Sequence, residues 1–122
     1  MDTLKNQKKI VVADDNANIC ELLQTGLERA GYVTACVENG LELINYLKNN
    51  QDIDAVILDL VMPERGGISV FETIRSISPA SIIIIYTGYT DYKNSVYCRA
   101  ADAFIEKTDG LARILEVLNE LL

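Results

Sequence analysis

The sequence predicts an α/β protein in which a parallel sheet is covered by helices on both faces. Short, continuously apolar segments alternate with longer segments whose apolar residues recur at helical spacing. This strand–helix order repeats five times along the 122 residues. Continuously apolar strands are typical of parallel sheets that are buried on both faces, and the crossovers between them are expected to be right-handed.

The first half of the chain contains two strand–helix pairs. Lys9–Ala13 is a short β-branched run and is predicted as the first strand. The apolar residues of Ile19–Leu27 share one face of a helix, which an asparagine at position 16 or 18 can cap and Gly31 can end. Tyr32–Val37 is predicted as the second strand. Leu41–Leu47, which follows a turn signal, is predicted as the second helix.

The second half continues the pattern with three more pairs. Ala55–Leu58 is an uninterrupted apolar run and is predicted as the third strand. After a loop that contains Pro63, the apolar residues of Ile68–Ile77 predict the third helix. Ser81–Tyr86 gives the strongest strand signal because it includes four consecutive isoleucines. The remaining elements, in the order helix, strand and helix, are predicted at Tyr92–Ala101, Ala103–Ile105 and Leu111–Leu122.

The composition is that of one globular domain with an excess of acidic over basic residues. Hydrophobic residues make up 49% of the chain, and the formal net charge is −7. Because nucleic-acid binding needs a basic patch, a nucleic-acid partner is not expected. No apolar segment is long enough to span a membrane, and the polar start of the chain lacks the apolar core of a secretory signal. We therefore expect a cytoplasmic protein without a membrane partner.

The chain has three cysteines and no histidine. Cys20, Cys36 and Cys98 lie in apolar stretches without C-x-x-C spacing, which favours free thiols packed in the core over a metal or redox site. The lack of histidine excludes a histidine general base, histidine metal ligands and Ser-His-Asp catalysis.

Polar residues follow four of the five predicted strands at the point where each strand ends. Asp14 and Asp15 follow the first strand, and Asp59 follows the third. Thr87 follows the fourth strand, and Lys107 lies just beyond the fifth. Taken singly, these residues are also consistent with helix caps, turn formers and a solvated lysine. Ligands bind at the carboxyl ends of strands in open α/β sheets, so their joint occurrence predicts a functional site there.

This set of residues suits phosphoryl transfer with Mg²⁺. Carboxylates brought together repel one another unless a cation is present, and Mg²⁺ prefers oxygen ligands from carboxylates, waters and phosphate. An aspartate such as Asp59 can act as a nucleophile and form an aspartyl-phosphate. Lys107 could pair with one phosphate oxygen, and the Thr87 hydroxyl could donate to another. Positioning and charge neutralisation provide most of the catalysis in such reactions.

The same residues give the sequence a resemblance to a known family. From about Ile10 to Leu121 it resembles the receiver domain of two-component response regulators. The motifs that support the resemblance are the Asp14-Asp15 pair, the run Asp59-Leu60-Val61-Met62-Pro63 with Gly66-Gly67 after it, Thr87 and Lys107. The resemblance implies a flavodoxin-like fold with strand order 2-1-3-4-5 and one receiver domain over residues 1–122.

The resemblance also implies a function and a role for each residue. Asp59 would accept a phosphoryl group from a histidine kinase or a histidine phosphotransfer protein, so the protein would be a signalling switch and not an enzyme. Asp15, Asp59 and the backbone carbonyl of Val61 would bind Mg²⁺ directly, and Asp14 would bind it through water. Lys107 would contact the phosphoryl group. Thr87 and Phe104 would move inward as the switch. The surface of the last two helices and the last strand would then face a partner, an effector or a second copy.

Five positions distinguish this chain within the resemblance. Thr108 stands where a proline is common, Gly88 stands where an alanine is common, and Phe104 lacks the hydroxyl group of a tyrosine.

In the family, the positions of Val61 and Tyr89 flank the phosphoryl group and the attacking water. Both side chains are bulky here, and neither is an acid or an amide that could orient the water. We therefore expect slow self-dephosphorylation.

Other functions fit parts of the pattern. A degenerate receiver would act as a phosphorylation-independent interaction module, and Gly88 and Thr108 leave this alternative open. A Mg²⁺-dependent phosphohydrolase similar to the haloacid-dehalogenase group would need an Asp-x-Asp pattern, whereas the pair here is adjacent. A flavin-binding flavodoxin is disfavoured because the loop after the first strand is acidic. The chain is expected to be either a single-domain receiver or a segment of a longer regulator or hybrid kinase.

Overall fold

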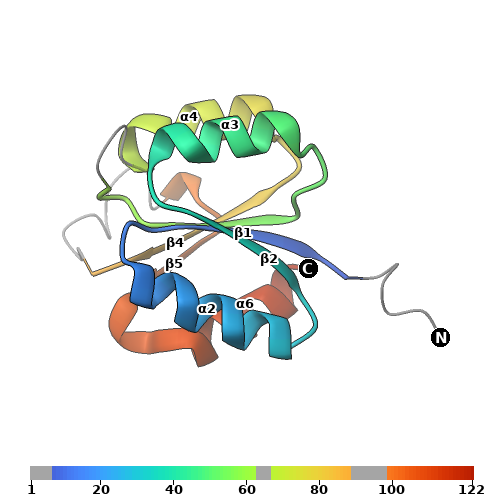
Figure 1. The fold of residues 1–122 in the computed structure, drawn as a ribbon, viewed down its shortest axis with the longest axis vertical. Helices are drawn as coiled ribbons and strands as arrows, with labels where there is room; N and C mark the ends of the chain where they lie inside the picture. Colours follow the sequence, from blue (N-terminus) through green and yellow to red (C-terminus); the bar gives the residue numbers. More distant parts are fainter. Residues whose placement is uncertain (1–6, 63–66, 89–98) are drawn as a thin grey trace.

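The structure is a computed structural model and describes residues 7–62, 67–88 and 99–122. Its centre is a parallel five-stranded sheet (Figure 1). The strands are β1 (Lys9–Ala13), β2 (Val33–Val37), β3 (Ala55–Leu58), β4 (Ile82–Thr87) and β5 (Ala103–Glu106). Their order is β2-β1-β3-β4-β5, which confirms the predicted flavodoxin-like α/β fold.

Helices cover both faces of this sheet. On one face lie α3 (Gly40–Asn49) and α4 (Gly67–Ile77), and on the other lie α2 (Ala17–Arg29) and α6 (Gly110–Leu121) (Figure 1). The predicted helix at Tyr92–Ala101 falls largely outside the described residues. Within the described part of the chain, no helix is long and apolar enough to cross a membrane.

Side chains of the central strands alternate between two apolar clusters, one on each face of the sheet. Val11 and Leu58 belong to the cluster that includes Leu43 of α3. Val12 and Ile57 belong to the other cluster, which contains apolar residues of α2 and α6. Successive strand residues point to opposite faces, so a strand buried on both sides must be apolar throughout. This is the physical reason for the uninterrupted apolar runs in the sequence.

The start and the end of α2 follow the predicted capping residues. The Asn16 side chain accepts hydrogen bonds from the backbone N–H groups of Asn18 and Ile19, at 2.9 and 3.3 Å. Gly31 adopts a φ of 99°, a left-handed conformation that glycine adopts without steric cost just after a helix. The cap fixes the first turn of α2 directly after the acidic pair that ends β1.

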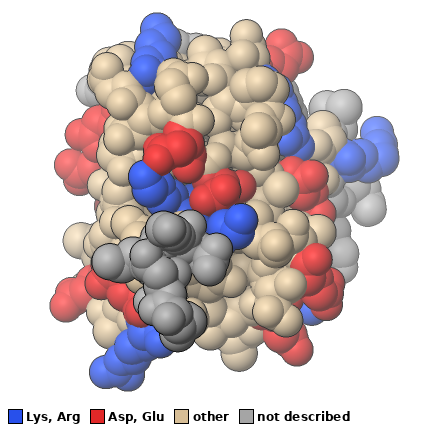
Figure 2. Space-filling model, turned by 90° about the vertical axis from the view of Figure 1, so that its right-hand side faces the viewer, with Lys and Arg blue, Asp and Glu red and all other residues tan. Residues whose placement is uncertain are grey.

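The edge of the sheet where the strands begin lies opposite the predicted site. Figure 2 shows this side of the molecule, on which acidic and basic side chains are interspersed over the described residues. Lys9 at the start of β1 forms an ion pair with Asp52, and both side chains are exposed. This pair is remote from the carboxyl ends of the strands and provides matched control positions for the site.

Candidate functional site

Strand register places the two central aspartates side by side. Ala13 of β1 pairs with Leu58 of β3, so the residues that follow, Asp14 and Asp59, leave neighbouring strands at the same level. The Asp59 backbone N–H donates to the Ala13 carbonyl at 3.0 Å, which extends the ladder by one bond. The sheet therefore brings together two carboxylates that are 45 positions apart in the sequence.

Asp59 is the centre of a hydrogen-bonded group at this edge. Its Oδ1 accepts a hydrogen bond from the Thr87 hydroxyl at 2.9 Å. Its Oδ2 lies 3.1 Å from Lys107 Nζ, and the same ammonium lies 2.7 Å from Asp14 Oδ2. The exposed fractions of Asp14 and Asp59 are only 3% and 4%, and Thr87 is fully buried. Lys107 thus bridges two carboxylates that are almost completely removed from bulk water.

The charge of Lys107 is maintained by these two partners. Burial on its own lowers the pKa of a lysine, because the ammonium form loses water. The hydrogen bonds and negative charges of Asp14 and Asp59 outweigh burial and raise the pKa of Lys107 above its usual value of 10.5. Lys107 therefore presents a fixed positive charge beside Asp59.

The three aspartates form a group that fits a divalent cation. Asp14, Asp15 and Asp59 each offer a carboxylate oxygen, and these oxygens lie within 4.8 Å of one another. Asp15 is exposed to solvent, whereas the other two are buried. One lysine cannot balance three carboxylates, so the group retains an attraction for a cation. Oxygen ligands that open to water on one side suit Mg²⁺, which keeps several of its waters when bound.

Backbone contacts hold the buried carboxylates in place. Asp14 Oδ1 accepts a hydrogen bond from the N–H of Asn16 at 2.9 Å, and Asp59 Oδ1 accepts one from the N–H of Val61 at 3.2 Å. Val61 therefore lies directly beside Asp59, with 38% of its surface exposed. The role of its carbonyl in metal binding stays a prediction.

Tyr86 is a site residue that the sequence reasoning missed. Its hydroxyl donates to the backbone carbonyl of Lys107 at 3.3 Å. Burial is the main cause that raises the pKa of Tyr86, so its hydroxyl keeps its proton as a donor. Lys107–Asp109 forms one turn of 3₁₀ helix, and this turn includes Thr108, which stands where a proline is common in the family. The signal in the sequence was a phenol inside an apolar strand, directly before Thr87.

Of the remaining positions predicted for switching and for dephosphorylation, the structure describes Phe104 but not Tyr89. Phe104 on β5 pairs with Ile85 in the sheet and packs, partly buried, against the apolar cluster under α3 and α4. Tyr89 lies outside the described residues. The switching role of Phe104 and the dephosphorylation role of Tyr89 both stay predictions.

The expectation of free cysteines is wrong for two of the three. Cys20 of α2 and Cys36 of β2 form a disulfide, with their Cα atoms 6.2 Å apart. Helix α2 packs against β2, so residues 16 positions apart in the sequence meet in space. A search for C-x-x-C spacing detects only cysteines that are near in sequence and therefore misses this pair. Cys98 lies outside the described residues.

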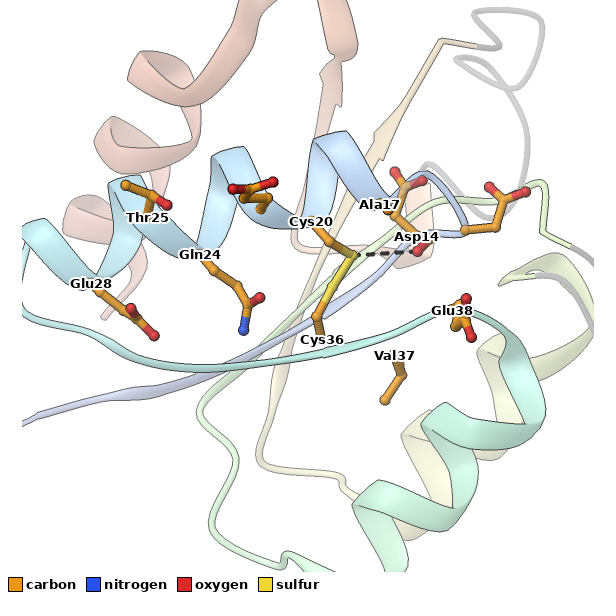
Figure 3. A pocket seen from close by; sticks show the side chains of 11 residues that line it. Asp14, Ala17, Cys20, Gln24, Thr25, Glu28, Cys36, Val37 and Glu38 are labelled. Atoms are coloured by element: carbon orange, nitrogen blue, oxygen red, sulfur yellow. Dashed lines mark hydrogen bonds between the residues drawn. A yellow bond between two sulfur atoms is a disulfide. The ribbon is translucent and has the colours of Figure 1, made fainter.

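An open cavity of about 420 Å³ connects the disulfide with the acidic pair (Figure 3). Cys20 and Cys36 lie on its wall, with Asp14 beside them. Asp15 also lines it. Its remaining acidic lining residues are Glu21, Glu28 and Glu38. The cavity thus gives solvent access to the disulfide beside the candidate metal site.

Known sequences resemble this chain over most of its length. The family model described as the response regulator receiver domain matches residues 10–119. The probable transcriptional regulator ycf27 of Guillardia theta is 35% identical over 82 residues, which is 67% of this chain and 32% of that protein. The response regulator SaeR of Staphylococcus aureus is 28% identical over 115 residues, which is 93% of this chain and 50% of SaeR. The chain therefore spans half or less of the length of these relatives.

Solved structures share the same fold. The response regulator TrrA of Thermotoga maritima, in complex with Mg(2+)-BeF, has a TM-score of 0.87 and 34% identity. The alignment covers 95% of this chain and all of TrrA. TrrA in complex with the histidine kinase ThkA gives a TM-score of 0.85 over 95% of this chain and 99% of that chain. With a parallel sheet in the order β2-β1-β3-β4-β5 and a family match over residues 10–119, the chain belongs to the response regulator receiver domain family.

Proposed function

We propose that this chain is a phosphoacceptor switch of a two-component phosphorelay, with Asp59 as the acceptor. The observation that carries the proposal is the convergence of Thr87 and Lys107 on the buried Asp59 carboxylate, beside Asp14 and Asp15. The family membership and the complex of TrrA with a histidine kinase support it. The receiver domain is proposed to extend over residues 1–122.

The donor in this proposal is a phosphohistidine of a histidine kinase or a phosphotransfer protein. Because the 122 residues contain no histidine, that histidine belongs to another protein. An Asp59 oxygen attacks phosphorus and forms the O–P bond. The P–N bond to the donor's imidazole breaks, and its electron pair stays on the nitrogen. Lys107 pairs with one phosphoryl oxygen, and the Thr87 hydroxyl donates to another.

The cation in this proposal is Mg²⁺, and the structure of TrrA with Mg(2+)-BeF supports it. Asp15, Asp59 and the carbonyl of Val61 would bind the ion directly, and Asp14 would bind it through water. When bound, Mg²⁺ would offset the repulsion between the carboxylates and the incoming phosphoryl oxygens. The lysine that now bridges Asp14 and Asp59 would then be free to face the phosphoryl group.

In this proposal, phosphorylation of Asp59 signals by changing one surface of the protein. Thr87 and Phe104 respond to phosphorylation and alter the face formed by β5, α6 and the predicted helix at Tyr92–Ala101. That face would meet an effector or a second copy of the chain. The protein is proposed to act in the cytoplasm, without a nucleic-acid or membrane partner, and to catalyse only its own phosphorylation and slow dephosphorylation.

Intact mass measurement tests the proposal. The protein is incubated with Mg²⁺ and acetyl phosphate, and in parallel with a phosphorylated histidine kinase. We expect a gain of one phosphoryl group that needs Mg²⁺ and that maps to the peptide containing Asp59. Protein that gains no phosphoryl group from either donor would instead act as a phosphorylation-independent interaction module.

The Val61→Asn variant is expected to lose its phosphoryl group faster than the wild-type chain. Val61 lies directly beside Asp59 and is partly exposed, so an amide there can orient an attacking water that valine cannot. We expect an acceleration of about 10-fold, below the usual range for a full general base. The decay of the phosphorylated mass after removal of the donor measures this rate.

Val33→Asn is the matched control for this variant. Val33 lies at the start of β2, at the opposite edge of the sheet, with 41% of its surface exposed. The same substitution there should leave the decay rate unchanged. Equal decay of the phosphorylated Val61→Asn and wild-type proteins would show that position 61 does not set the lifetime.

A further inference from the structure

The disulfide joins α2 to a strand at the edge of the sheet. Cys20 is the fourth residue of α2, and Cys36 is the residue before the end of β2. Strand β2 has only one neighbour in the sheet, β1, among the strands that the structure describes. The crosslink therefore adds a covalent restraint to a strand that the described sheet holds on one side only.

Cys20 contacts the acidic pair directly, and Cys36 immediately precedes a residue that is bonded to it. Cys20 Sγ lies 3.4 Å from the backbone carbonyl oxygen of Asp14, and the dashed line in Figure 3 joins these residues. On the other side, the N–H of Asp14 donates to the carbonyl of Val37, which directly follows Cys36, at 3.0 Å. The backbone of Asp14 thus contacts Cys20 on one side and the residue that follows Cys36 on the other.

The contact at Cys20 changes with the oxidation state of the sulfur. In the disulfide, Sγ carries no proton, so the 3.4 Å contact with the Asp14 carbonyl is not a hydrogen bond. In the reduced protein, the Cys20 thiol has a proton that it can donate to this oxygen. Reduction would therefore replace a covalent restraint between α2 and β2 by a weak hydrogen bond onto the acidic-pair loop.

The disulfide is also accessible to reagents. Cys20 and Cys36 are only partly buried, and both line the open cavity of about 420 Å³. Thiol–disulfide exchange requires a thiolate to approach one of the sulfur atoms, so access controls the rate. A disulfide sealed in the core would be protected from this attack, whereas this one faces solvent through the cavity in Figure 3.

We propose that Cys20–Cys36 is a reversible redox modification site that sets the Mg²⁺ affinity of the adjacent aspartates. Reduction by a dithiol breaks the S–S bond, delivers two electrons and two protons to the cysteines, and leaves the reagent as its own disulfide. Oxidation by a disulfide such as oxidised glutathione runs the exchange in reverse. The oxidised form fixes the Asp14 backbone and binds Mg²⁺ more tightly, because a restrained site loses less freedom on binding. This coupling rests on the proposed function, whereas formation of the disulfide does not.

The first measurement counts thiols across a redox series. The full chain is equilibrated with mixtures of reduced and oxidised dithiothreitol, its free thiols are alkylated, and its intact mass is determined. We expect two more alkylated cysteines at the reducing end than at the oxidising end, both in the wild-type chain and in Cys98→Ser. If the thiol count is the same at both ends, Cys20 and Cys36 do not form a reversible disulfide, and the proposal is overturned.

The second measurement compares Mg²⁺ binding by the oxidised and reduced wild-type chain in calorimetric titrations. We expect about fivefold weaker binding after reduction, at the low end of typical coupling between two sites. The double variant Cys20→Ser, Cys36→Ser should show one affinity under both conditions. Equal affinity in the two wild-type forms overturns the regulatory part. If neither form binds Mg²⁺ or gains a phosphoryl group, the proposed function fails together with the coupling, and the thiol count still decides whether the disulfide is reversible.

Discussion

The Asp59→Asn variant is expected to gain no phosphoryl group from acetyl phosphate or from a phosphorylated kinase. An amide at this position is a neutral and poor nucleophile, so the O–P bond of the aspartyl-phosphate cannot form. Asp59 is the carboxylate on which both Thr87 and Lys107 converge, so the groups that would bind the phosphoryl oxygens are arranged around it. Intact mass after incubation with each donor and Mg²⁺ measures the effect, and thermal unfolding shows whether the variant is folded.

Asp52→Asn is the matched control, because it removes one carboxylate at the opposite edge of the sheet. Asp52 is exposed and pairs with Lys9, away from the carboxyl ends of the strands. This variant should gain one phosphoryl group as the wild-type chain does. A folded Asp59→Asn protein that still gains the full phosphoryl mass would place the acceptor on another residue and contradict the proposed role of Asp59.

The arrangement around Asp59 was predictable because it depends on features that the sequence displays directly. The apolar runs that end at Ala13 and Leu58 define parallel strands, and parallel strands share one carboxyl edge. The residues that follow each apolar run are then placed at that edge of the sheet. The predicted ends of β4 and β5 each fall one residue before the observed ends, yet Thr87 and Lys107 still reach the site. A side chain at a strand end tolerates such an error, since its position is set by the sheet.

Contacts between side chains on different elements were not predictable in the same way. The Cys20–Cys36 disulfide depends on how α2 lies against β2, and the sequence gives only the separation along the chain. The bond from the Tyr86 hydroxyl to the Lys107 carbonyl depends on the rotamer of a buried phenol and on the turn after β5. Such distances come from packing, which periodicity and strand order do not specify.

The Lys107→Met variant is expected to be less stable than the wild-type chain in the absence of Mg²⁺. Methionine keeps most of the volume of lysine but removes the ammonium that bridges Asp14 and Asp59. Two carboxylates with exposed fractions of 3% and 4% then lose their charged partner. We expect a loss of about 2–3 kcal/mol in the free energy of unfolding, as for buried charged groups left without a partner. Urea unfolding with a chelator present measures this loss.

Two comparisons separate the loss of the bridging charge from a general effect of the substitution. Mg²⁺ should restore much of the stability of Lys107→Met, because a cation bound by the aspartates again offsets their repulsion. Lys9→Met removes the same charge from the exposed pair with Asp52, so it should change stability little, with or without Mg²⁺. If both variants unfold like the wild-type chain in chelator, the bridge from Lys107 to Asp14 and Asp59 does not stabilise the fold. If Lys107→Met is destabilised but Mg²⁺ does not restore it, the loss arises from packing, and the aspartates do not hold the ion.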